Sequence, residues 1–582
     1  MTIIKSKNEE MYPIVGIEYC TNCHHYPFDL RLVSAHCTHY QVHKKDGKEI
    51  FLQSILLLFC YNPTAPLKIL VYSSAFAASH TNYMARLADT LTEAGHNVTF
   101  FVPIIDESRE NHLGVKLTKD VIKLEQDETM KEKKISIDKI TGKFWTMDVT
   151  SQNGRMLFET FYEQVVLLTG NLFRNKEIIE QLRSREYDVA IAEPVMLNGL
   201  ALFRHLGIEK VVIASSCPNY DIVMAAMGEP GETSYVPAVF SGVTGDRMDF
   251  ANRFENHEIY NLMLQIYKEM FDDEAKVFRS FLGDDFPNWE ELIPDTSLHF
   301  ANSIPYIDFP RPSIQKTIDI GGISVDIEKI QSEKLSSDWD VILDKREKNM
   351  FLSFGSLAKS SEMPQEYKNN LIHVFKSMKN VTFIWKYESD DVSFADGIEN
   401  VIFVKWAPQT ALLNDNRLTA FLGHGGLGST FEASFLGKPA IMVPIFWDQT
   451  RNSHMLSRLG MTITLHKSDL GDLLKLKNTF FEILNNESYR LSAEKVADVI
   501  RNQPTKPKEL VVKYIEFVGK YGPFHHMTPY SVKMPWYQRY NYDVYLYKFS
   551  LYFVPTFVFI IVLKTALFYL PIRLVSKVQK NN

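Results

Sequence analysis

The first strongly patterned stretch of the chain changes its hydrophobic period twice. Residues 67–76, LKILVYSSAF, form an apolar run typical of a buried strand. Residues 80–95 then place apolar side chains at helical spacing, and Gly95 ends that helix. Residues 96–103, HNVTFFVP, return to a strand pattern. This order predicts a βαβ unit, which needs a parallel sheet with a right-handed crossover.

The same strand pattern recurs in both halves of the chain. Residues 309–324, FPRPSIQKTIDIGGIS, separate the halves with prolines and glycines that suit a linker. We therefore predict an α/β protein with two facing Rossmann-like domains of parallel sheets, over residues 66–318 and 319–525. Ligands of such folds bind beyond the carboxyl ends of the strands, so the two domains would share a cleft. The further predicted strands are 187–194 and 209–218 in the first half, and 350–356, 381–387, 401–406, 418–423 and 440–445 in the second.

Two apolar segments predict a membrane protein. Residues 549–574 are long enough to cross a bilayer, although Lys564 interrupts them and Pro555 is a site for a kink. We predict a transmembrane helix over 548–572, after a juxtamembrane segment at 526–547; a buried helix of the globular part is the alternative. The tail, 573–582, has basic residues and no acids, which predicts a cytosolic end. The short apolar run in residues 49–65 is typical of a signal peptide.

Composition narrows the class of function. The 582 residues are 45% hydrophobic and 23% charged, as in ordinary globular proteins, with a formal net charge of −7. The chain has no basic footprint, so we expect no nucleic-acid partner. Five cysteines, three of them before residue 50, do not form the framework of a disulfide scaffold.

Residues 1–48 contain a loose zinc-finger spacing. Cys20 and Cys23 precede His39 and His43, and Cys37 or His36 are alternative ligands. However, Pro27 falls where a finger needs regular structure, and no apolar pattern supports a small core. We expect no metal site here and interpret the segment as an N-terminal extension or the result of an upstream start codon. Whether it remains in the mature protein stays open.

A glycine-rich loop follows the strand at 418–423. The helix after it exposes unpaired N–H groups and the positive end of its dipole, which is an anion site. His424 and Ser429 add an imidazole and a hydroxyl, and Phe431 stands where a dinucleotide fingerprint would need a third glycine. The loop also lacks the lysine of a P-loop. Three glycines would let a phosphate approach the backbone: Gly425, Gly426 and Gly428.

Polar and aromatic residues around this loop suit the parts of a nucleotide sugar. Trp406 offers a flat face and Gln409 a paired donor and acceptor, which suit a nucleobase. Glu432, one turn into the helix, suits ribose hydroxyls, and Asp448 with Gln449 suits sugar hydroxyls. Base, ribose, phosphate and sugar recognition therefore follow one another within about forty residues.

Residues 406–452 resemble the signature of the UDP-glycosyltransferases, in the membrane-bound animal UDP-glucuronosyltransferase branch and its nematode-like members. The pattern W-x-P-Q, H-G-G, S/G-x-x-E-A, G-x-P and D-Q-x-x-N is matched at nearly every fixed position. The resemblance extends from about residue 67 to the end of the chain and implies a GT-B fold with an acceptor domain followed by a UDP-sugar domain. It implies uracil at Trp406 and Gln409, ribose at Glu432, diphosphate at Ser356, His424, Gly426 and Ser429, and sugar at Asp448 and Gln449.

The resemblance also implies a catalytic pair. The family's base is a histidine in the first strand–helix loop, where this chain has His80. A helix N-terminus disfavours an imidazolium and keeps the imidazole neutral, as a general base requires. The family's partner carboxylate corresponds to Glu193, where many relatives carry aspartate. Asp188 begins the same strand at the wrong end of the sheet.

The sequence thus predicts an enzyme that moves glucuronate or glucose from a UDP-sugar to a hydroxyl of a small lipophilic acceptor, with inversion, in conjugation of the detoxification type. It predicts no metal and no cofactor beyond the UDP-sugar co-substrate. By resemblance, we expect a single-pass type I protein of the endoplasmic reticulum membrane with lumenal domains and with sequons at Asn97, Asn380 and Asn486. The alternatives are a non-catalytic UDP-sugar-binding membrane subunit and a zinc-finger membrane regulator. The donor sugar, the acceptor and a homo- or hetero-oligomeric state stay open.

Overall fold

The computed structural model describes residues 65–580, apart from 134–141, 148–150, Asn219 and Leu357. It also describes a short antiparallel pair of strands, β1 (Lys44–Lys45) and β2 (Lys48–Glu49). The remaining residues of the predicted N-terminal extension and signal peptide, with the cysteines and histidines of the finger-like spacing, lie outside the described residues.

The first lobe is built on a seven-stranded sheet in which every neighbouring pair of strands is parallel. Alternate residues of a strand face opposite sides of the sheet. Leu70 and Tyr72 accordingly belong to one buried cluster, and Ile69 and Val71 belong to another. In spatial order the strands are β5 (Asp120–Leu124), β4 (Asn97–Pro103), β3 (Lys68–Tyr72), β6 (Val189–Ala192), β7 (Val211–Ser215), β8 (Leu298–Ala301) and β9 (Thr317–Asp319).

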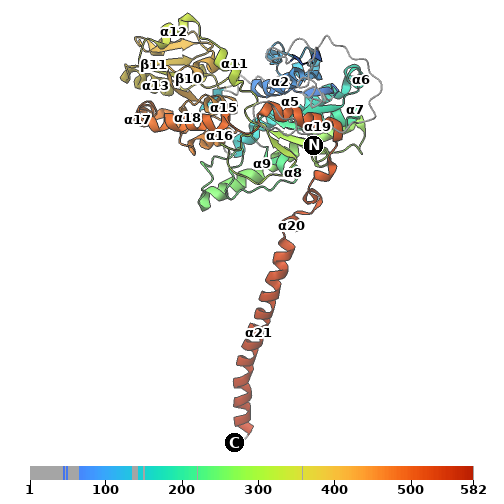
Figure 1. Ribbon diagram of the computed structural model, residues 1–582. Coiled ribbons are helices and arrows are strands. Elements are labelled where there is room, and N and C mark those ends of the chain that lie inside the picture. The colour runs from blue at the N-terminus through green and yellow to red at the C-terminus, as the bar shows by residue number, and fades with distance from the viewer. Residues whose placement is uncertain are drawn as a thin grey trace. The chain divides into compact units, whose positions relative to one another are not determined.

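Helices labelled in Figure 1 flank this sheet, and the buried clusters show that their apolar side chains cover both of its faces. The predicted first helix runs from Ala78 to Glu93, and Gly95 after it has a φ of 93°. The helices of this lobe are α2 (Ala78–Glu93), α3 (Glu128–Glu132), α5 (Ser151–Arg174), α6 (Lys176–Arg183), α7 (Asn198–Leu206), α8 (Asp221–Met227), α9 (Phe250–Leu282) and α10 (Trp289–Leu292), with short turns η2 (Glu107–Arg109) and η3 (Gly142–Trp145).

The second lobe repeats the architecture with a six-stranded sheet, also parallel throughout. Its strands, in spatial order, are β12 (Val401–Val404), β11 (Val381–Lys386), β10 (Lys348–Ser353), β13 (Leu418–Gly423), β14 (Ala440–Met442) and β15 (Thr462–Thr464). Its helices are α11 (Ile327–Ser332), α12 (Ser337–Leu343), α13 (Gln365–Ser377), α14 (Gln409–Asn414), α15 (Leu427–Phe435), α16 (Gln449–Ser457), α17 (Leu473–Asn485) and α18 (Glu487–Arg501). The predicted fold class, two Rossmann-like domains of the GT-B type, is confirmed.

The two lobes exchange segments. Phe144 and Trp145, which precede most of the first lobe's helices in the chain, are buried in the core of the second lobe. The Trp145 indole N–H donates to the Lys359 carbonyl at 3.1 Å, and Lys467 Nζ donates to the Phe144 carbonyl at 2.8 Å. Through these contacts a segment of the first lobe forms part of the core of the second lobe.

A helix after the second lobe returns to the first. The helix α19 (Pro507–Tyr521) buries Val511, Ile515 and Val518 in the cluster formed by Ile69 and Val71, and Figure 1 shows it among the blue and green elements of the first lobe. The segment predicted as one domain, 319–525, therefore contains a helix that packs on the first sheet.

The chain then continues through η7 (His525–Met527), η8 (Tyr530–Lys533) and α20 (Trp536–Arg539) into α21 (Tyr542–Lys580). The helix α21 is continuous through Pro555 and Lys564. Its residues Tyr542–Tyr569 are long and apolar enough to cross a membrane, with a mean hydropathy of 2.1 and no buried residues in that window. The alternative of a buried helix is therefore wrong for this segment.

Candidate active site

The first lobe brings His80 and Glu193 together at the carboxyl ends of neighbouring strands. His80 lies in the first turn of α2, after β3, and Glu193 directly follows β6. The Nδ1 atom of His80 is 2.9 Å from each carboxylate oxygen of Glu193. Both side chains are buried, with 7% of each residue exposed. The carboxylate thus holds Nδ1 as the protonated nitrogen, which leaves the basic lone pair on Nε2.

Hydrogen bonds from Ser216, together with His80, favour the ionised form of Glu193. Burial alone would raise the pKa of this carboxyl, but His80 and the side-chain and backbone hydrogen bonds of Ser216 outweigh it and lower the pKa. The Ser216 N–H donates to Glu193 at 3.0 Å, and its hydroxyl lies 2.8 Å from His80 Nδ1. The Tyr220 hydroxyl adds a longer contact of 3.4 Å. At neutral pH Glu193 is therefore a carboxylate that can stabilise a protonated His80.

In the second lobe, two glycines leave room for the imidazole of His424. A Cβ atom on Gly355, whose φ is 83°, would lie 2.7 Å from the ring, and one on Gly426 would lie 2.6 Å from Nε2. Burial, with the nearby Lys386 charge, lowers the pKa of His424 to about 4. Its Nδ1 is buried and has no hydrogen-bond partner among the described residues. His424 is therefore a neutral side chain beside the glycine loop, and its Nδ1 atom has no hydrogen-bond partner among the described residues.

The glycines of the loop have different reasons to be glycine. Gly425 has a φ of 81°, and a Cβ there would lie 2.3 Å from Ser453 Oγ. Gly426 is the N-cap of α15, which starts at Leu427, and its Cβ would meet His424. Gly428 has no atom within 4 Å of a Cβ position. Packing inside the protein thus accounts for two of the three glycines, and only Gly428 faces open space where a ligand can approach.

Three predicted nucleotide contacts form one hydrogen-bonded group. The Gln409 Nε2 atom donates to Ser429 Oγ at 2.9 Å and to Glu432 Oε2 at 2.6 Å. Burial raises the pKa of Glu432, and the Gln409 hydrogen bond opposes that shift. Nearby in the sequence Trp406 is 80% exposed, and Ser356, after β10, is also exposed. Their side chains are therefore accessible to a ligand.

The turn after β14 carries the other two predicted contacts. Gln449 Oε1 accepts from the backbone N–H groups of Ile445 and Phe446 at 2.9 and 3.1 Å, so this oxygen already fixes the turn. Asn452 Nδ2 donates to Asp448 Oδ2 at 2.8 Å and to the carbonyl of Gly425 at 3.1 Å. Asn452 therefore joins the turn to the glycine loop.

A small cavity beside His80 is lined by residues of both lobes. It has a volume of about 40 Å³ and is lined by His80 and by mostly apolar side chains of the first lobe, with one residue of the second lobe, Trp447. Burial raises the pKa of Asp448, while the charge of His80 opposes that shift, so these two groups are in electrostatic reach of each other. The residues from the first lobe are Phe76, His80, Phe161, Val195, Cys217, Tyr220, Phe240 and Tyr267.

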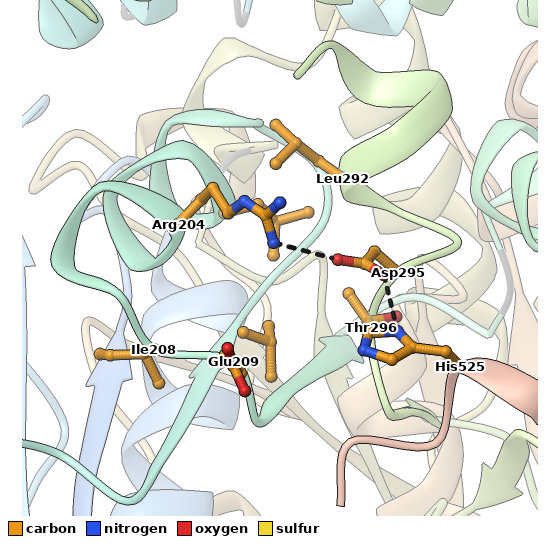
Figure 2. Close-up of a pocket in the computed structure, with 9 residues that line it drawn as sticks. Arg204, Ile208, Glu209, Leu292, Asp295, Thr296 and His525 are labelled. Atoms are coloured by element: carbon orange, nitrogen blue, oxygen red, sulfur yellow. Dashed lines mark hydrogen bonds and ion pairs between the residues drawn. The ribbon is translucent and has the colours of Figure 1, made fainter. Parts of the chain in front are cut away.

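A larger depression of about 260 Å³ lies elsewhere in the first lobe. Figure 2 shows Arg204 and His525 directed at Asp295, with which they form ion pairs of 3.4 and 2.7 Å. Val211, the first residue of β7, also lines it. Because ligand sites in parallel sheets lie beyond the carboxyl ends of strands, this depression is on the wrong side of the sheet for chemistry at His80. The His525–Asp295 ion pair in this depression holds the segment between α19 and α20 against the first lobe.

Comparison with known proteins identifies the family. Residues 67–581 match the profile of the family described as UDP-glucoronosyl and UDP-glucosyl transferase. The chain belongs to this family. It is therefore a glycosyltransferase, an enzyme that uses a UDP-sugar as donor, and this favours catalysis over the alternative of a non-catalytic subunit.

Relatives agree with this family, and a solved structure shares the fold. The UDP-glycosyltransferase is 28% identical over 495 residues to Caenorhabditis elegans ugt-50, which is provisionally assigned as a UDP-glucuronosyltransferase; the match covers 82% of this chain and 91% of the relative. It is 25% identical over 489 residues to UDP-glucuronosyltransferase 1A8 of Rattus norvegicus, covering 83% and 88%. Among solved structures, Phytolacca americana UGT2, complexed with UDP-2fluoro-glucose and pterostilbene, has a TM-score of 0.53 at 16% identity, covering 78% of this chain and all of the other.

Sequence reasoning missed several residues of this candidate site. Ser216 follows β7 and contacts both members of the His80–Glu193 pair. Gly355 leaves room for His424, and Asn452 holds Asp448 in place. Ser216 directly follows a predicted strand and Asn452 is a fixed position of the D-Q-x-x-N motif, so strand ends and motif positions were the available signals.

Proposed function

We propose that the protein transfers glucuronate or glucose from its UDP-sugar to a hydroxyl of a small lipophilic acceptor, with inversion, in one displacement. The observation that carries this proposal is the buried His80–Glu193 pair, with Nδ1 held by the carboxylate at 2.9 Å and the ring at the wall of an apolar cavity. An imidazole with its basic lone pair directed away from the carboxylate is arranged as a general base.

In this mechanism His80 Nε2 takes the proton of the acceptor hydroxyl while the oxygen of that hydroxyl bonds to the anomeric carbon of the donor sugar. The bond between that carbon and the β-phosphate oxygen breaks, and UDP leaves with the electron pair. Glu193 stabilises the imidazolium that forms, as a buried carboxylate does in a catalytic triad. The mostly apolar wall of the cavity suits a lipophilic acceptor and keeps water from competing for the sugar.

The donor would lie along the second lobe. Trp406 would stack on uracil, Gln409 would bind its polar edge, and Glu432 would accept from the ribose hydroxyls. The diphosphate would meet the N-terminus of α15 at Ser429 and the open side of Gly428, with Ser356 and His424 beside it. Because the pKa of His424 is lowered to about 4, its role would be that of a neutral N–H donor, not of a cation. Asp448 and Gln449 would accept from and donate to the sugar hydroxyls.

The proposed chemistry assigns the charge of the leaving group to backbone N–H groups and the helix dipole, and needs no metal ion. We also propose that the protein is anchored in the endoplasmic reticulum membrane by α21 as a type I protein with lumenal lobes. Asn380 of one sequon is exposed at the turn before β11, so its glycan would report a lumenal position. A mobility shift of the full-length protein on endoglycosidase H treatment that becomes smaller in Asn380→Gln tests that orientation.

The reaction is tested by incubating the full chain in detergent with labelled UDP-glucose or UDP-glucuronate and a panel of phenols. We expect a β-glycoside from one of the two α-linked donors. A product with retained configuration, or no product with either donor while UDP still binds, would contradict the proposed reaction.

A further inference from the structure

Trp447 adopts a backbone conformation that is unfavourable for its side chain. It lies in the turn between β14 and α16 with a φ of 56°. In the described part of the chain only two other non-glycine residues have a positive φ, Glu186 and Asn541. The left-handed region brings Cβ too close to the following carbonyl oxygen, and a bulky residue there is a genuine outlier. The surroundings of Trp447 must therefore hold it in this conformation.

Contacts on both sides of the turn explain how the conformation is held. The indole packs against the Phe446 ring at a centroid distance of 5.1 Å and an angle of 89°. Phe446 in turn packs on Phe144 at 4.5 Å, inside the core of the second lobe. The backbone N–H groups of Ile445 and Phe446 donate to Gln449, which closes the turn. The position of the indole is thus imposed by the fold.

The indole lines the cavity beside His80. It is the only contribution of the second lobe to that lining, and all of the other lining residues belong to the first lobe. The cavity has a volume of about 40 Å³, whereas an engineered apolar cavity that binds benzene has about 150 Å³. An aromatic acceptor therefore needs the lining side chains to move apart, and a flat ring needs less movement than a branched group. Trp447 is half-buried, so one part of its ring remains able to contact such a ligand.

The next residue in the chain is Asp448, which the proposed function assigns to the donor sugar. Trp447 is thus next in the chain to the proposed sugar contact and also lines the cavity, so under the proposed function its ring would bound the space from which a hydroxyl reaches the anomeric carbon. A flat ring can stack on the indole within a narrow gap, while a branched or globular group collides with it.

We propose that Trp447 determines which acceptors the enzyme accepts, by admitting flat aromatic alcohols and excluding bulky ones. This inference rests on the proposed function of the His80 cavity as the acceptor site. It assigns the specificity to a side chain of the donor lobe, on the turn that also holds the donor contact.

The test compares Trp447→Gly and Trp447→Phe with the wild-type full chain, using 2-naphthol as the flat acceptor and 4-(1-adamantyl)phenol as the bulky one. Glycine removes the indole and relaxes the positive φ. Glu186→Gly is the matched control, because it relaxes a φ of 54° at an exposed turn outside the cavity lining. We expect Trp447→Gly to lower kcat/KM for 2-naphthol at least tenfold and to raise it for the bulky phenol at least fivefold. Trp447→Phe should fall between, the KM for the UDP-sugar should stay within threefold, and Glu186→Gly should change neither ratio.

A preference ratio that stays within twofold of wild type in Trp447→Gly would overturn the inference. Protection by UDP against thermal unfolding checks that each variant is folded. If wild type shows no transfer with either donor, the proposed function fails, and binding of the two phenols by equilibrium dialysis then decides the inference. A reversed binding preference in Trp447→Gly supports it, and an unchanged preference overturns it.

Discussion

Replacing Glu193 by glutamine tests the electrostatic half of the proposed mechanism. The substitution keeps the shape of the side chain and removes a charge that lies 2.9 Å from His80 Nδ1, with 7% of either residue exposed. A hydrogen bond to a charged group contributes about 1.5–3 kcal/mol, and a factor of ten in rate corresponds to about 1.4 kcal/mol. Because this charge matters most when His80 is protonated, the loss falls mainly on the transition state. We therefore expect kcat to fall by about 10- to 150-fold.

The assay is steady-state transfer to a phenol by the full chain in detergent, with KM for the UDP-sugar measured in parallel. That KM should stay within twofold, because Glu193 lies in the first lobe and the proposed donor contacts lie in the second. Glu193→Asp should retain more activity than Glu193→Gln, since it keeps the charge. Asp188→Asn removes an exposed carboxylate at the start of β6 and serves as the control. If Glu193→Gln is folded and stays within threefold of the wild-type kcat, the charge has no role in the reaction.

Three further predictions, which use four substitutions, have defined outcomes. Trp406→Ala should weaken UDP binding, measured by calorimetry, about tenfold or more, since stacking on a base contributes about 1–3 kcal/mol. The melting temperature should stay unchanged because Trp406 is 80% exposed. An unaltered affinity for UDP would exclude Trp406 from the base site. Gly428→Ala should weaken UDP binding without loss of stability. Gly426→Ala should lower the melting temperature, because a Cβ at residue 426 meets His424 and a Cβ at residue 428 meets nothing. Equal effects of the two variants would contradict this distinction. His299 is fully buried, and burial lowers its pKa from 6.5 to about 3. Between these two pH values the unfolded state binds more protons than the folded state, so the free energy of unfolding decreases as the pH falls below 6.5, by about 2 kcal/mol at pH 5. His299→Gln should flatten this pH dependence in thermal melts, and an unchanged slope would exclude His299 as its source.

The sequence predicted the central strands of both sheets and the points where they end, for a physical reason, whereas β5, β8, β9 and β15 toward the sheet edges were not predicted. Buried parallel strands need short continuous apolar runs, and ligands of such sheets bind where the strands end. His80 and Glu193 follow β3 and β6, and these strands are neighbours in the sheet, so two residues far apart in the chain meet. The hydrogen-bonded group of Gln409, Ser429 and Glu432 lies within the predicted motif.

Features that depend on packing between distant segments were not predictable from local patterns. The burial of Trp145 in the second lobe and the return of α19 to the first lobe follow from which core each apolar face fits, and periodicity does not carry that information. The same limit applies to Gly355, whose need to be glycine comes from the ring of His424 nearly seventy residues away. Trp447 reads as an ordinary aromatic residue in sequence, because its positive φ appears only in the folded turn.

The central claim is that His80 is the general base, and the most direct measurement is transfer by His80→Ala beside wild type, with UDP binding measured on the same samples. The account predicts that kcat falls by about a hundredfold or more, since general base catalysis contributes about 10²–10⁴-fold, while the affinity for UDP stays within twofold. If wild type and His80→Ala release UDP and form glycoside at equal rates, the mechanism is wrong.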